Sequence, residues 1–70
     1  MKYHVELSEG RERVTTPFTG DSAAGDARDN FKHARAALMA GQCLALIAES
    51  ESGALVTLER VRLDPSMTAH

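Results

Sequence analysis

The chain has few of the residues that small proteins use to reinforce a limited core. It contains one cysteine, Cys43, among 70 residues, so no disulfide can form within a single chain. A chain of this length buries only about 60% of the surface that it exposes when unfolded, and oligomerisation is a common source of further stability. A lone thiol is typical of a reducing compartment, so we expect a cytoplasmic protein.

Aromatic residues and long apolar segments are also scarce. The three aromatic residues are Tyr3, Phe18 and Phe31, too few for the stacking platform of a typical binder of single-stranded nucleic acid. The longest mostly apolar run, residues 43–48, is far shorter than the roughly 20 residues that cross a bilayer. The N-terminal segment also lacks the apolar centre of a secretory signal. We therefore expect neither export nor insertion into a membrane.

The overall charge balance is mildly acidic. The formal net charge is −2, with 26% charged residues, which is not the basic balance of a dedicated nucleic-acid binder. A hydrophobic content of 43% is sufficient for a folded domain and argues against general disorder. We expect one domain over residues 1–65, followed by a flexible tail at residues 66–70.

Two N-terminal segments have the alternation of half-buried strands. Apolar and polar residues alternate in residues 2–7 and again in residues 12–18. Gly10 lies between the two segments, where a tight turn often requires a positive φ. The pattern predicts a β-hairpin. Because Pro17 cannot donate a ladder hydrogen bond, the second strand should lie at a sheet edge or end there.

The next segment has helical periodicity. Asp21 or Ser22 is a suitable N-cap and Gly41 a stop signal, so the helix should end just before Gly41. Because Gly25 weakens the first turn, we expect the regular helix to begin nearer Asp26. At 100° per residue the helix has a narrow apolar face of mostly small residues, which suits close packing on a sheet. That face consists of Ala23, Ala27, Phe31, Ala34 and Leu38.

Two further strands are predicted after the helix. The apolar run Gln42–Glu49 is too short for another helix and is typical of a central strand. A polar turn containing Gly53 separates it from residues 54–63, which form the last predicted strand. The expected fold is α+β with ββαββ order: a mostly antiparallel four-stranded sheet with one helix packed on one face.

One helix cannot cover both faces of such a sheet. Because residues 43–48 are apolar on both faces, one apolar set must lie away from the helix, and an uncovered apolar face usually marks an interface. The alternative is that the tail and the turn at residues 8–11 cover that face. We predict a protein-association module, most simply a homodimer or another homo-oligomer. The candidate interface residues, placed on the face opposite the helix, are Leu44, Leu46, Val56 and Leu58.

Two other arrangements of the interface remain open. A one-residue shift in register would replace the candidate residues with Ile47 and its neighbours. The strand edge at residues 12–16 is a second candidate, because unpaired edges favour the addition of another strand.

Basic residues provide an alternative function. They are candidates for two basic patches: Arg28, Lys32 and Arg35 on the outer helix face, and Arg60 and Arg62 on one face of the last strand. Such patches would suit a small nucleic-acid-associated regulatory protein. Acidic residues are interspersed with these arginines and lysines, however, and a charged helix face is usually a solvated one.

The chain has no spacing typical of a metal centre or a catalytic motif. His4, His33 and Cys43 are not paired at ligand spacing, so we expect no metal and no cofactor. His33 follows Asp29 by one helical turn, which predicts a surface pair. The serines at residues 49–52 lie in an acidic turn, where a nucleophile would not be activated. We expect no enzymatic activity; an active site built between two subunits is the third alternative.

Overall fold

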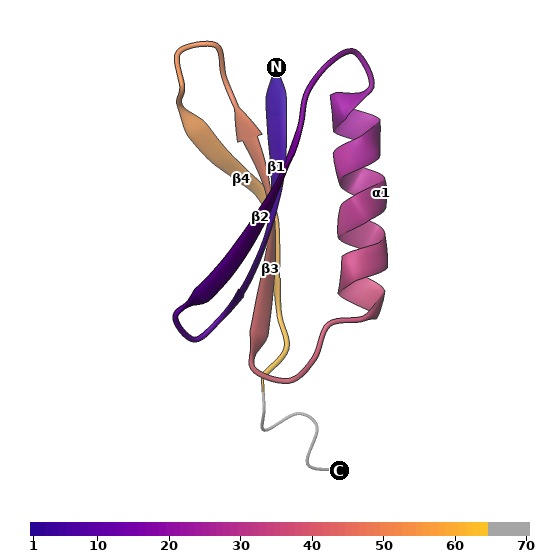
Figure 1. The fold of residues 1–70 in the computed structure, drawn as a ribbon, viewed down its shortest axis with the longest axis vertical. Helices are drawn as coiled ribbons and strands as arrows, with labels where there is room; N and C mark the ends of the chain where they lie inside the picture. Colours follow the sequence, from indigo (N-terminus) through magenta and orange to yellow (C-terminus); the bar gives the residue numbers. More distant parts are fainter. Residues whose placement is uncertain (65–70) are drawn as a thin grey trace.

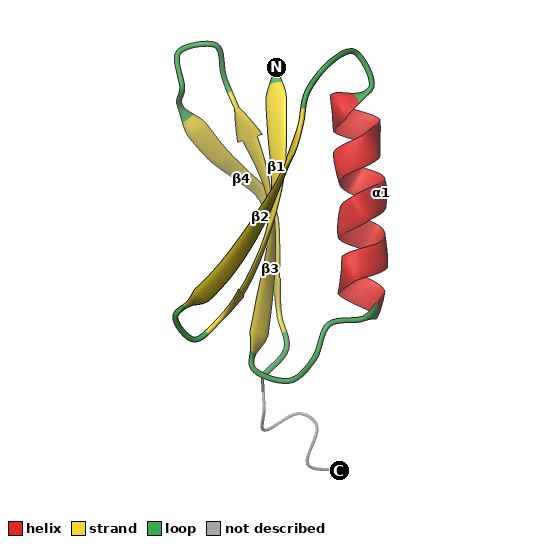
Figure 2. Cartoon of the chain, viewed as in Figure 1, coloured by secondary structure: helices red, strands yellow, loops and turns green. Residues whose placement is uncertain are grey.

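The computed structural model describes residues 1–64 as one antiparallel sheet with one helix beside it (Figures 1 and 2). The strands are β1 (Lys2–Glu9), β2 (Glu12–Phe18), β3 (Gln42–Glu49) and β4 (Leu55–Arg62), and the helix α1 is Ala23–Ala36. The sheet has the order β2-β1-β3-β4. The expected ββαββ fold is confirmed, and the structure supplies the strand order that the sequence left open. The expected tail at residues 66–70 lies outside the described residues.

The N-terminal hairpin forms as predicted. Its two strands pair antiparallel from Tyr3–Phe18 to Glu9–Glu12, and Gly10 in the turn has a φ of 60°. That backbone conformation suits a residue without a Cβ. Strand β2 is an edge strand, so the missing amide hydrogen of Pro17 interrupts a ladder on one side only, as expected.

The apolar face of α1 packs on the sheet as predicted. Ala23, Ala27 and Phe31 are buried on the helix, and Ala34 and Leu38 are partly buried against the core. On the sheet side the core cluster contains Val5 of β1 and two leucines of β3. The small helix residues allow α1 to approach the strands closely, with Phe31 as its largest contact.

The helix begins earlier than expected. Ser22 occupies the N-cap position and α1 starts at Ala23, so the expectation of a start near Asp26 was wrong. Gly25 lies within the first turn. The Ser22 hydroxyl donates to the Asp26 carboxylate over 3.2 Å, and the cap forms no side-chain bond to the backbone. Burial of Ala23 and Ala27 stabilises this turn more than the single glycine weakens it.

The helix also ends earlier than expected, at Ala36. The following amides of Ala37 and Leu38 donate to the carbonyls three residues before them, each over 3.2 Å, which is the tighter geometry of a final turn. The amide of Met39 then donates to the Gln42 side chain over 2.8 Å. These bonds satisfy the backbone without further α-helix. The helix α1 has 14 residues. No helix within residues 1–64 is long and apolar enough to cross a bilayer.

One predicted placement is wrong. Leu44 and Leu46 do not lie opposite the helix; they are 0% and 1% exposed and belong to the core beneath α1. Leu46 pairs with Val5, and Leu44 pairs with Leu7. Paired residues of neighbouring strands share a face, so the side of β1 that packs on the helix determines the side of β3. The run 43–48 is apolar on both faces, and its own pattern does not distinguish them.

Candidate interaction surface

The sheet face away from α1 is not an open apolar surface at its centre. The residues of β3 on this face are Cys43, Ala45 and Ile47, since their neighbours in the strand face the helix. Ala45 is nonetheless only 3% exposed, and the other two are partly buried. Ala45 lies between Glu6 of β1 and Arg60 of β4, whose long side chains shield a small methyl group. The alternative interface around Ile47 therefore offers little exposed apolar area.

Exposed apolar side chains gather on β4 instead. Leu55, Val56 and Leu58 are 64%, 56% and 45% exposed, and we call these three residues the β4 patch. The helix packs mainly on β1, β2 and β3. Figure 1 shows the β3–β4 turn standing away from α1. Val56 and Leu58 were predicted as interface residues. Leu55 was missed, although the adjacent apolar pair Leu55–Val56 was a signal that both faces of this strand are apolar.

A β-bulge lies within the patch. Thr57 pairs with Ile47, and Glu59 pairs with Leu46, so Leu58 has no partner in the register. Leu55 pairs with Glu49 and lies on the face away from the helix. Val56 pairs with Ala48 and lies on the helix side, so its predicted placement opposite the helix was wrong. The patch therefore presents apolar groups on both faces of an edge strand. A bulge also bends the edge and interrupts a regular ladder with another chain.

The other edge of the sheet has a different surface. Strand β2 is exposed along most of its length, but Val14, 63% exposed, is its one large exposed apolar residue. Glu12 and Arg13 precede it, and Pro17 removes a donor from the strand. Charges and proline are devices that protect an edge from pairing. The candidate edge at residues 12–16 is open, but its side chains do not favour association.

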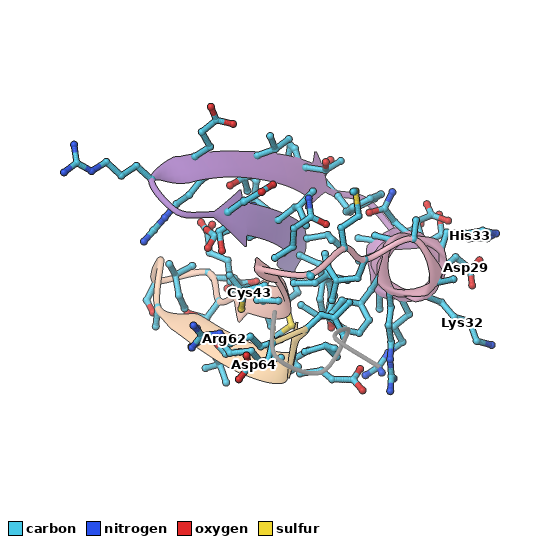
Figure 3. The ribbon with its side chains drawn as sticks, turned by 90° about the horizontal axis from the view of Figure 1, so that it is seen from below. Asp29, Lys32, His33, Cys43, Arg62 and Asp64 are labelled. Carbon is cyan, nitrogen blue, oxygen red and sulfur yellow. The ribbon has the colours of Figure 1, made fainter. Side chains whose placement is uncertain are left out.

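The five candidate basic residues lie on two separate surfaces. Arg28 and Lys32 are exposed on α1, whereas Arg60 and Arg62 lie on the sheet face away from the helix, opposite Ala45 and Cys43. Figure 3 shows Lys32 and Arg62 on opposite sides of the molecule. Arg35 is 3.9 Å from the carboxylate of Glu59. The basic residues of the helix face and those of the strand face therefore form two groups on different sides of the molecule.

The two arginines of β4 line a hollow at one end of the sheet. Its volume is about 350 Å³. Cross-strand pairing places Arg13, Ser8, Cys43 and Arg62 in one row on this face. The full lining is Ser8, Gly10, Gly41, Cys43, Arg60 and Arg62. Within the described residues this lining has two guanidinium groups and no carboxylate, which suits an anionic group.

A second hollow, of about 370 Å³, lies at the other end of the sheet and is acidic in part. Its lining includes Lys2, Glu49 and Glu51. The carboxylate of Glu49 accepts a hydrogen bond of 2.7 Å from His4 Nε2. In the neighbouring turn the Ser50 hydroxyl lies 2.9 Å from that of Ser52 and accepts from the amide of Ala54 over 3.1 Å. The serines thus stabilise the turn, as expected of a hairpin tip.

The histidine on the helix makes a different contact from the one predicted. His33 Nδ1 donates to the backbone carbonyl of Asp29 over 2.8 Å, so the expected pair with the Asp29 carboxylate is not the contact formed. Both side chains point away from the sheet in Figure 3. In residues 1–64 no three His, Cys, Asp or Glu side chains come together as ligands for a metal ion. No protein-family model, no curated protein and no solved structure matches this chain.

Proposed function

We propose that this chain is a small protein-association module that forms a homodimer through the β4 patch. The observation that carries the proposal is the position of three large exposed apolar side chains within four consecutive residues of an edge strand. Single exposed apolar residues are common on protein surfaces, whereas a contiguous group marks an interaction site. Its place of action is the cytoplasm, where a free, partly buried thiol such as Cys43 is usual.

A second copy of the chain is a suitable partner for this patch. In a two-fold dimer the same residues of both copies meet, so one small patch covers itself and the buried apolar area doubles. The core cluster of fully buried residues is small, with Val5, Ala27, Phe31, Leu44 and Leu46 as its members. Association is a common way in which domains of this size gain stability.

The contact in the dimer is made by side chains more than by backbone pairing. Leu58 is an extra residue in β4, so the odd-numbered residues before it and the even-numbered residues after it lie on the same face of the sheet. A second β4 strand therefore cannot continue the ladder along the full edge. Packing of Leu55, Val56 and Leu58 against their symmetry mates requires no continuous ladder, and it covers side chains on both faces of the strand.

The test is the molar mass in solution, measured by light scattering on a sizing column at low micromolar concentration. We expect the wild-type chain to elute at twice the 7.6 kDa of one copy. Val56→Glu should elute as a monomer, because a charge would be buried in the interface without a partner. The matched control is Val14→Glu, which changes a similarly exposed valine on the other edge strand. It should remain a dimer.

Circular dichroism of both variants separates association from folding. Val56 and Val14 are exposed, so both variants should keep the spectrum of the wild-type chain. A wild-type mass of one copy even at about 100 μM would overturn the proposal. Equal loss of the dimer in the two variants would show that the association does not depend on the β4 patch.

A further inference from the structure

We propose that in this dimer the two β4 strands run antiparallel, and that Glu51 of each copy enters the hollow lined by Arg60 and Arg62 of the other copy. The inference rests on the proposed homodimer and adds its orientation and its polar contact. Three observations support it. Charges of opposite sign lie at the two ends of the β3–β4 hairpin, the hollow is lined by arginines, and the β4 patch lies between the acidic turn and these arginines.

Charges of opposite sign occupy the two ends of this hairpin. Glu51 is exposed in the turn that precedes β4, and Arg60 and Arg62 are exposed near the end of the strand. The other two acidic residues nearby have partners in their own chain: Glu49 with His4, and Glu59 with Arg35. Glu51 takes part in neither pair. It is the acidic side chain of the turn that is available to a second molecule.

The charge separation selects one orientation of the dimer. If the two β4 strands ran parallel, the Glu51 side chains would approach each other, as would the two Arg62 side chains. Like charges placed together disfavour an interface. If the strands run antiparallel, each acidic turn meets the basic end of the partner strand. The interface is then self-complementary, as a two-fold contact must be.

The pairing of β3 with β4 places Glu51 where it can contact the arginines of a partner β4 strand. The patch spans residues 55–58, so a two-fold axis that passes between Val56 and Thr57 places its residues opposite one another. Leu55 is level with Glu49 across the hairpin, and Glu51 lies just beyond that level in the turn. Rotation about this point places the turn level with residues 60–62 of the partner. An arginine side chain is long enough to close the remaining gap.

The hollow suits a carboxylate. It has about 350 Å³ of space, and its described lining contains two guanidinium groups, the Ser8 hydroxyl and no acidic side chain. A guanidinium presents its donors in a planar fork that matches the two oxygens of a carboxylate. The hollow lies on the sheet face away from α1, so the helices of the two copies do not obstruct the contact.

Charge reversal tests the contact. Glu51→Arg and Arg60→Glu should each raise the dimer dissociation constant by about fivefold to tenfold, because each places like charges together. The double variant carrying both changes should return to within about threefold of the wild-type value, since it restores opposite charges. Glu12→Arg, which reverses an exposed acid on β2, is the matched control and should leave the constant unchanged. Analytical ultracentrifugation gives the constant.

The outcomes distinguish this inference from the proposal on which it rests. If the wild-type chain is a dimer and Val56→Glu a monomer, but Glu51→Arg has no effect, the charge contact is wrong and the homodimer stands. If the single reversals weaken the dimer and the double variant does not recover, the pairing of Glu51 with Arg60 is overturned. If Arg60→Glu leaves the dimer intact but abolishes binding of a single-stranded oligonucleotide, the hollow belongs to nucleic acid instead. A monomeric wild-type chain overturns both proposals.

Discussion

Strands β3 and β4 are neighbours that each contain two leucines, yet these leucines have opposite surroundings. Strand β3 contains Leu44 and Leu46, the two largest fully buried side chains of the described residues. Strand β4 contains Leu55 and Leu58, which are among the most exposed apolar residues. The difference lies in the position of α1, which packs mainly on β1, β2 and β3. Apolar residues indicate that a surface will be covered, but they do not indicate whether the chain itself covers it.

The largest expected difference is between equivalent truncations on the two strands. Leu46→Ala should lower the free energy of unfolding by about 2–5 kcal/mol, because it leaves a cavity beneath the helix. Leu58→Ala should lower it by less than about 0.5 kcal/mol when the protein is monomeric, because the side chain is already exposed. Urea denaturation at low protein concentration measures both. Equal losses would show that β4 is covered within a single chain.

A second prediction concerns how closely the helix covers β3. Ala27 is 0% exposed between α1 and the sheet, so Ala27→Leu should cost about 1–3 kcal/mol through overpacking. Ala36, at the end of the same helix, is exposed, and Ala36→Leu should change the stability by less than about 0.5 kcal/mol. Thermal unfolding followed by circular dichroism compares the two. If Ala27→Leu has no effect, the helix does not pack as closely as the structure shows.

The smallest expected effects come from two glycines and have opposite signs. Gly53, in the turn before β4, has a φ of 88°, so Gly53→Ala should cost about 1–2 kcal/mol. Gly25 lies inside α1, and an added Cβ would meet nothing within 4 Å, so Gly25→Ala should stabilise the protein by about 0.5–1 kcal/mol. Denaturant midpoints report both changes. A stabilising Gly53→Ala would contradict the turn geometry that positions the β4 patch.

Much of the fold could be predicted from local patterns. The alternation of the first hairpin, the apolar face of the helix and the bounds of Gln42–Glu49 all agree with the structure. The helix ends were predicted less well, because Gly25 and Gly41 suggested boundaries that packing and the Gln42 side chain moved. Three of the four candidate interface residues, Leu44, Leu46 and Val56, were placed on the wrong face for a similar reason. Leu44 and Leu46 belong to a run that is apolar on both sides, and only pairing with β1 gives the run its orientation.

The amino-acid sequence by itself determined the element order, the ββαββ class and the residues with which the helix packs, because these depend on periodicities within single segments. The tertiary structure decided the strand order, the side of β3 that faces the helix and the exposure of β4. Those features depend on which distant segments pair and on how far one short helix reaches across four strands. The basic residues of the helix and of β4 were likewise separated by the fold, since a sheet and its helix have outer surfaces on opposite sides.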